Sequence, residues 1–145
     1  MLKVRSWLIK KQNFVSLFGN KMLSLRHKSN KMGINKIKVV LTEEAKAFLD
    51  AQPFKAQQKI YYNIFKVEEG VMKVDIFKKL ENTEIWEFRT LYNGICYRLF
   101  SFWDTEEETL VIATHGIVKK TQKTPLKEIS KAEEIRKEYF NNKKK

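Results

Sequence analysis

The chain has 145 residues, of which 43% are apolar, so it is long enough for one domain with a hydrophobic core and short for two. Its 29 basic and 17 acidic residues give a net charge of +12, which favours a polyanionic partner such as nucleic acid, the ribosome or an anionic membrane surface. One cysteine excludes a disulfide framework and a thiolate metal site, and the two histidines lack metal-ligand spacing, so we expect a cytoplasmic protein without metal or cofactor.

The first segment, residues 1–31, contains eight basic and no acidic residues, and its apolar positions recur at helical spacing. This pattern predicts a basic amphipathic helix that lysines interrupt too often for a membrane span. Three interpretations stay open: translation that starts at Met32, an extension that binds RNA, a membrane surface or a partner, and an organelle transit peptide. We expect residues 1–31 to contribute nothing to the fold.

A strand and two helices are expected next. Alternating apolar residues over 34–41 predict a half-buried strand. Thr42 is expected to cap a helix that carries carboxylates in its first turn, and Pro53 to begin a second helix that stops at Gly70. Residues 71–84 are ambiguous and favour a short helical turn or a loop.

Three strands are predicted within residues 85–118. Apolar, β-branched and aromatic runs cover residues 85–92, 95–103 and 109–118. They are separated by Asn93-Gly94, a hairpin signal, and by the acidic stretch 104–108, which reads as a solvated turn. Antiparallel pairing of these runs is therefore expected.

A last helix is predicted after Pro125, with Thr124 as its N-cap and a frayed basic tail at 141–145. The order strand, helix, helix, three strands, helix predicts an α+β domain over residues 32–140. We expect a small antiparallel sheet of about four strands, with the helices packed on one face and the other face open.

Charged residues interrupt two of the apolar runs. Arg89 and Arg98 carry a permanent charge that is costly to bury unless it has a partner or faces a groove. Strand alternation places Glu87 and Arg89 on the face opposite Trp86 and Phe88, where they form either a surface ion pair or part of a functional site. Whether Arg98 shares that face depends on a register that the sequence leaves open.

The loop after the last strand is basic. Lys119, Lys120 and Lys123 form either a solvated loop or a phosphate-binding patch, to which the hydroxyl and amide groups of residues 121–124 add donors. His115, near the end of the strand, is either a structural histidine or an acid–base group, because its ordinary pKa lies near neutrality.

The segments WEFR, YRLF and HGIVKKTQKTP resemble the RelE-type toxins of bacterial toxin–antitoxin pairs, and among them the HigB-like, phage-related branch. The resemblance covers Met32 to about Phe140. It implies a RelE-like fold and a metal-independent, ribosome-dependent endoribonuclease that cuts mRNA and inhibits translation. It also implies a cognate antitoxin, expected to be a DNA-binding helix-turn-helix protein, besides mRNA and the ribosome, and no membrane partner.

The resemblance also implies roles for individual residues. Arg98 would stabilise charge on the phosphate, Arg89 would orient the RNA backbone, and Lys119 and Lys120 would supply charge and proton transfer. Some RelE relatives carry a tyrosine in this basic loop where the present chain has none, so the acid and base stay unassigned and His115 is the reserve candidate. Further RNA contacts are expected from Lys123, Lys78 and Lys79.

Two other functions remain open, because a fold does not determine a function. The same scaffold could be a non-catalytic RNA-binding or ribosome-binding module. It could also be a degenerate toxin that only binds its antitoxin.

Overall fold

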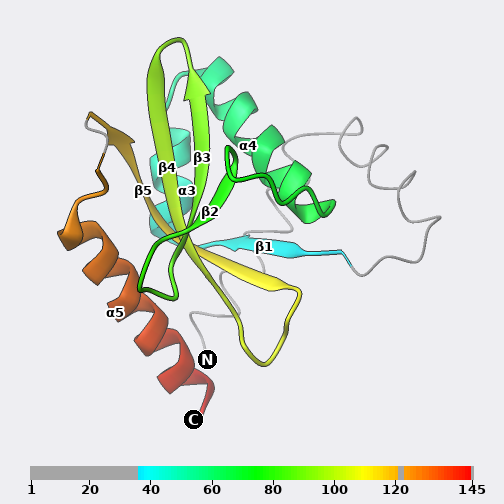
Figure 1. The fold of residues 1–145 in the computed structure, drawn as a ribbon, viewed down its shortest axis with the longest axis vertical. Coiled ribbons are helices and arrows are strands. Elements are labelled where there is room, and N and C mark those ends of the chain that lie inside the picture. The colour runs from blue at the N-terminus through cyan, green and yellow to red at the C-terminus, as the bar shows by residue number, and fades with distance from the viewer. Residues whose placement is uncertain (1–35, 121–122, 145) are drawn as a thin grey trace.

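The computed structural model describes residues 36–120 and 123–144 of the chain (Figure 1). The interpretations of residues 1–31, including a start at Met32, lie outside the described residues. The elements follow in the order β1 (Lys38–Leu41), α3 (Glu43–Asp50), α4 (Phe54–Glu68), β2 (Phe77–Lys79), β3 (Trp86–Tyr92), β4 (Ile95–Trp103), β5 (Leu110–Lys119) and α5 (Leu126–Lys143).

The strands form one mixed sheet in the order β1-β5-β4-β3-β2, in which β1 runs parallel to β5 and the other neighbours are antiparallel. The α+β fold is therefore confirmed, with five strands where about four were expected. The additional strand is β2, which lies in the ambiguous stretch and pairs with β3. A purely antiparallel sheet was wrong, because the edge strand β1 pairs in parallel with β5.

Local signals place the turns and helix ends as predicted. Asn93 and Gly94 both adopt positive φ, 52° and 77°, which the tight turn between β3 and β4 requires. Thr42 caps α3, since its side-chain oxygen accepts a hydrogen bond from the amide of Ala45 at 3.1 Å. Gly70, with φ at 96°, follows the end of α4.

Helices cover both faces of the sheet, so the expectation that they gather on one face was wrong. One core lies between the sheet and the α3–α4 pair, and a second lies between the sheet and α5. In Figure 1, the strands lie between α4 and α5. The reason is visible in β4, where Leu99 belongs to the first core while Phe100 and Phe102 belong to the second. A strand that is apolar on both sides needs cover on both faces.

The C-terminal helix begins and ends differently from its prediction. Pro125, not Thr124, occupies the N-cap position, and the helix has no side-chain cap. The hydroxyl of Thr124 instead donates a hydrogen bond to Glu87 of β3. At the other end α5 continues to Lys143, into the segment predicted as a frayed tail.

Asp104 explains the longer helix. This fully buried carboxylate accepts hydrogen bonds from the backbone amides of Glu106 and Glu107 and from the Tyr139 hydroxyl, and it forms an ion pair with Lys143. Burial raises the pKa of Asp104, but these hydrogen bonds outweigh burial and hold the pKa below its ordinary value. The turn between β4 and β5 is thereby tied to the end of α5.

Within residues 36–120 and 123–144, none of the helices has the length and apolar character that a bilayer crossing demands.

Candidate functional site

The strand register brings the two predicted arginines together. Arg89 of β3 and Arg98 of β4 lie directly opposite one another, so their side chains project from the same face. Lys119 of β5 lies opposite Cys96, two residues from Arg98, and therefore joins that face. Because Phe100, two residues further along β4, packs in the core beneath α5, this is the face that α5 partly covers.

Glu87 occupies the centre of this charged group. Only 3% of its side chain is exposed, and its Oε1 lies 3.4 Å from Nε of Arg89 and 3.6 Å from Nε of Arg98. The interpretation of Glu87 and Arg89 as a surface ion pair was therefore wrong. A buried carboxylate needs charge partners nearby, and two arginines supply them.

The loop before α5 is attached to the same carboxylate. The Thr124 hydroxyl lies 3.4 Å from Oε2 of Glu87, to which it donates, and Nζ of Lys119 donates to the Thr124 oxygen at 3.5 Å. We call these five residues, Glu87, Arg89, Arg98, Lys119 and Thr124, the arginine cluster. It joins β3, β4, β5 and the loop that follows β5.

The guanidinium groups of the cluster are held by backbone carbonyls. Nη1 of Arg98 donates to the carbonyl of Tyr97 at 3.1 Å, and Nη1 of Arg89 donates to the carbonyl of Val74 at 3.4 Å. The Nε atoms of both arginines are buried and have no hydrogen-bond partner among the described residues. The Arg98 side chain is 9% exposed and that of Arg89 27%, so Arg89 is the more accessible to a ligand.

The pKa of Lys119 is shifted by its surroundings in the cluster. Burial lowers its pKa most, and the positive charges of Arg98 and Arg89 lower it further, whereas Glu87 and Cys96 act in the opposite direction. The net result is a pKa below the ordinary lysine value. A lysine whose pKa moves toward neutrality can exchange a proton more readily at physiological pH.

The other predicted RNA-binding lysines divide between two locations. Lys78 lies opposite Glu87 in the register, on the cluster face, and Lys120 and Lys123 are exposed beside the loop. Lys79 lies opposite Trp86 and therefore points to the other face, where it pairs with Glu84 at 3.8 Å. The structure thus brings Lys78, but not Lys79, to the cluster face.

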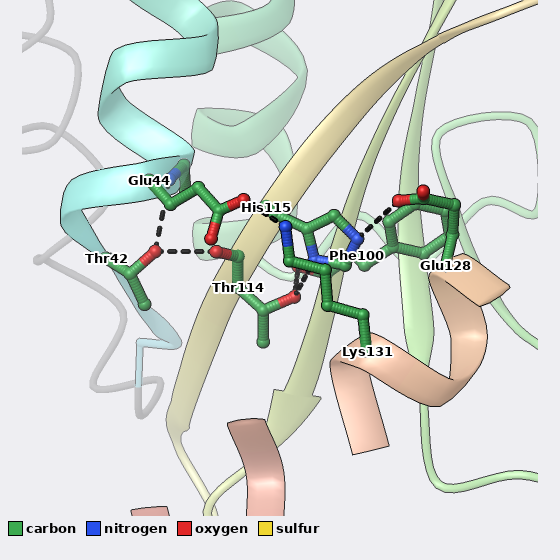
Figure 2. A network of polar contacts seen from close by, with 8 residues as sticks. Thr42, Glu44, Phe100, Thr114, His115, Glu128 and Lys131 are labelled. Atoms are coloured by element: carbon green, nitrogen blue, oxygen red, sulfur yellow. Dashed lines mark hydrogen bonds and ion pairs between the residues drawn. The ribbon is translucent and has the colours of Figure 1, made fainter. Parts of the chain in front are cut away.

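His115 lies in the interior, outside the arginine cluster. It is 2% exposed, its Nδ1 lies 2.9 Å from the Thr114 hydroxyl, and its Nε2 lies 2.8 Å from Oε2 of Glu128 in α5 (Figure 2). Since a carboxylate only accepts hydrogen bonds, Nε2 carries the hydrogen and donates it to Glu128. Burial lowers the pKa of His115, and Glu128 offsets part of that effect.

The network around His115 connects both helical layers through β5. The Thr42 hydroxyl donates to the carbonyl of Thr114 at 2.6 Å, and Lys131 of α5 forms an ion pair with Glu44 of α3, as Figure 2 shows. Phe100 lies between Glu87 of the arginine cluster and His115, because it is opposite Glu87 in β3 and opposite His115 in β5. With both ring nitrogens occupied, His115 is placed to fix α5 against the sheet, and its predicted acid–base role stays a prediction.

The sequence placed Glu87 beside Arg89 on one strand face but did not predict its burial between two arginines. Thr124 was considered as a helix cap and as a donor of the basic loop, and no sequence signal could have directed it to Glu87. Among residues 36–120 and 123–144, no group of three or more His, Cys, Asp or Glu side chains is arranged as a metal site.

The fold and this cluster define a small α+β domain with a basic, internally ion-paired site on one face of its sheet. A family model described as phage-derived protein Gp49-like (DUF891) matches residues 47–137, more than half of the chain. The chain therefore belongs to the Gp49-like family, and the resemblance to the phage-related branch of the RelE-type toxins is confirmed.

Among solved structures, the chain is similar to a chain from the toxin–antitoxin complex RelBE2 of Mycobacterium tuberculosis. The match has 19% sequence identity and a TM-score of 0.45, and covers 58% of the present chain and 99% of the other. A search of curated proteins returned no match.

Proposed function

We propose that this protein is the toxin of a bacterial toxin–antitoxin pair and that it acts in the cytoplasm as a metal-independent endoribonuclease. Its substrate would be mRNA on the ribosome, and cleavage would inhibit translation. The observation that carries the proposal is the arginine cluster, in which three cationic side chains from three strands share one sheet face. Membership in the Gp49-like family and the RelE-type resemblance support it.

For the cleavage of RNA, the cluster can supply charge stabilisation through its arginines and one proton-transfer group, Lys119. The 2′-oxygen of a ribose attacks the adjacent phosphorus while the bond from phosphorus to the 5′-oxygen breaks, which leaves a 2′,3′-cyclic phosphate and a 5′-hydroxyl. A base must take the 2′ proton, a cation must stabilise the additional negative charge on the phosphoryl oxygens, and an acid must protonate the 5′-oxygen.

Charge stabilisation is assigned to the arginines. The guanidinium of Arg98 is held by the Tyr97 carbonyl and by Glu87, so little reorganisation is needed when charge develops on the phosphate. Arg89, which is more exposed, would hold the neighbouring part of the RNA backbone. Lys119, with its lowered pKa, is the group of the cluster best suited to proton transfer.

Binding along the RNA backbone is assigned to the exposed lysines around the cluster, which are Lys78, Lys120 and Lys123. Each phosphate contact releases counterions, so affinity for RNA should fall steeply as salt rises. The cognate antitoxin would compete for the same face with an acidic or amphipathic segment, because a basic site calls for a charge-complementary inhibitor.

The decisive experiment is induced expression without antitoxin, followed by mapping of new mRNA 5′ ends, with Arg98→Ala as the matched inactive control. We expect growth arrest and new 5′ ends that depend on Arg98. A folded wild-type protein that leaves growth and transcripts unchanged contradicts the proposal. Salt-dependent RNA binding without cleavage would indicate a binding module, and antitoxin binding without a growth defect would indicate a degenerate toxin.

A further inference from the structure

We propose that Glu87 is a positioning residue whose buried carboxylate fixes Arg89 and Arg98 in one arrangement and anchors the basic loop to them. This inference rests on the proposed function, since it concerns the same site. Glu87 does not contact the substrate in this proposal, because only 3% of its side chain is exposed.

Glu87 offsets the repulsion between neighbouring positive charges. Arg89 and Arg98 lie directly opposite one another in adjacent strands, an arrangement that is unfavourable for like charges. Lys78 adds a third positive charge, since it lies opposite Glu87 itself. The Glu87 carboxylate lies within 3.6 Å of both arginine Nε atoms. One negative charge therefore attracts both arginines, whose mutual repulsion would otherwise push them apart.

The two carboxylate oxygens of Glu87 have different partners. Oε1 faces the arginines, whereas Oε2 accepts the hydrogen bond from Thr124. Thr124 in turn accepts from Lys119, at the end of β5. A single side chain therefore sets the relative positions of the charge-stabilising arginines and of the lysine assigned to proton transfer. Side-chain geometry of this kind matters because a displacement of about 1 Å can cost about 10²-fold in rate.

Glu87 also acts on Lys119 through its charge. The charge of Glu87 raises the pKa of Lys119, while burial, Arg98 and Arg89 lower it and Cys96 adds a smaller upward contribution. Removing the carboxylate charge leaves the lowering influences opposed only by Cys96. Lys119 should then lose its proton at a lower pH than in the wild-type protein.

The first test needs no RNA. The titration of the Lys119 side chain is followed by ¹³C NMR of its ε-carbon in the wild-type protein and in Glu87→Gln, which keeps an acceptor for Thr124 but removes the charge. We expect a lower titration midpoint in Glu87→Gln. The control is Glu84→Gln, because the Glu84 side chain is 62% exposed and pairs with Lys79 away from the cluster. A midpoint that is unchanged in a folded Glu87→Gln protein overturns the proposal.

The second test separates positioning from a purely structural role. With ribosome-bound mRNA as substrate, Glu87→Gln should cleave about 10²-fold more slowly while its RNA affinity stays equal or rises, because a negative charge has left a binding face. The pH at which the rate rises should move downward together with the Lys119 midpoint. Loss of stability alone, with normal cleavage by the folded fraction and a normal pH profile, contradicts the proposal.

A conservative variant keeps the inference testable where Glu87→Gln does not fold. Glu87→Asp retains the charge on a shorter side chain, so we expect a near-normal Lys119 midpoint but slower cleavage than in the wild type. Wild-type cleavage by Glu87→Asp would overturn the positioning role. If the wild-type protein itself does not cleave RNA, the proposed function fails, whereas the NMR titration still decides whether Glu87 controls Lys119.

Discussion

The substitution Arg98→Ala is the sharpest test of the proposed site. It removes the guanidinium that lies within 3.6 Å of Glu87 and that donates to the carbonyl of Tyr97. If Arg98 stabilises charge that develops only as the phosphate reacts, the cleavage rate should fall by about 10² to 10³, which corresponds to roughly 2.7–4 kcal/mol in the barrier. Binding of RNA should change much less, because exposed lysines supply most phosphate contacts.

The structure also limits the effect of this substitution on stability. Removing one partner of a buried ion pair typically costs roughly 3–5 kcal/mol when the other charge is left alone. Glu87 is not left alone in Arg98→Ala, since Arg89 remains 3.4 Å away and Thr124 still donates to its second oxygen. We therefore expect a loss below that range. Domains with an ordinary free energy of unfolding, about 5–15 kcal/mol, stay folded after such a loss.

The assay compares four proteins under single-turnover conditions with ribosome-bound mRNA: wild type, Arg98→Ala, Arg98→Lys and Arg89→Ala. Arg98→Lys keeps the charge but loses the planar fork, so its rate should lie between wild type and Arg98→Ala. Urea denaturation of each protein shows whether it is folded during the assay. A stable Arg98→Ala protein that cleaves at the wild-type rate refutes the reasoning, and one that unfolds shows that Arg98 is a structural ion-pair member.

Three further predictions follow from other contacts. Lys120→Ala should weaken RNA binding and reduce the slope of log affinity against log salt by about one, whereas Lys119→Ala should also slow cleavage. Asp104→Asn should lower the free energy of unfolding near neutral pH by roughly 3 kcal/mol, because Lys143 and Tyr139 lose a buried carboxylate; urea denaturation measures this. Burial holds the pKa of His115 below its ordinary 6.5, so the unfolded chain takes up a proton at a higher pH than the folded chain does. The stability that neutral His115 contributes is therefore complete above pH 6.5 and is lost as pH falls below it. His115→Gln should abolish that part of the pH dependence.

Much of the fold was predictable because its elements carry local signals. The strand runs at 85–92, 95–103 and 109–118 match β3, β4 and β5 closely, since each is bounded by turn residues that the chain needs at those positions. β2 was missed because it has only three residues, too few for alternation to be recognised. The second helical layer was missed for a different reason. The continuous apolar run of β4 was available, but only pairing with its neighbours shows that both of its faces are interior.

The candidate site was predictable in composition but not in arrangement. Arg89, Arg98 and Lys119 were identified by residue type and by the RelE-type resemblance, and the register then placed them on one face. Register depends on how neighbouring strands pair. A shift of one residue would turn every side chain of a strand to the opposite face, so no local pattern could decide the register. The burial of Glu87 follows from the same register, because a carboxylate becomes interior only when neighbouring strands and the loop around Thr124 surround it.

The position of α5 divides its sheet face into an apolar and a charged area. The helix is attached at two places, where its first turn holds His115 through Glu128 and its last turn holds Asp104 through Lys143. Between these attachments, α5 covers the apolar part of the face, which includes Phe102. Glu87 in β3 lies opposite Phe100, while Arg98 and Lys119 lie further along β4 and β5 from the Phe100–His115 pair. The same face thus contains an apolar area that stabilises the fold and a charged area in which Arg89, at 27% exposure, is more accessible than Arg98 at 9%. An antitoxin segment that binds the charged area would meet the first turn of α5 at its border, so substitutions in that turn should affect inhibition more than those in the last turn.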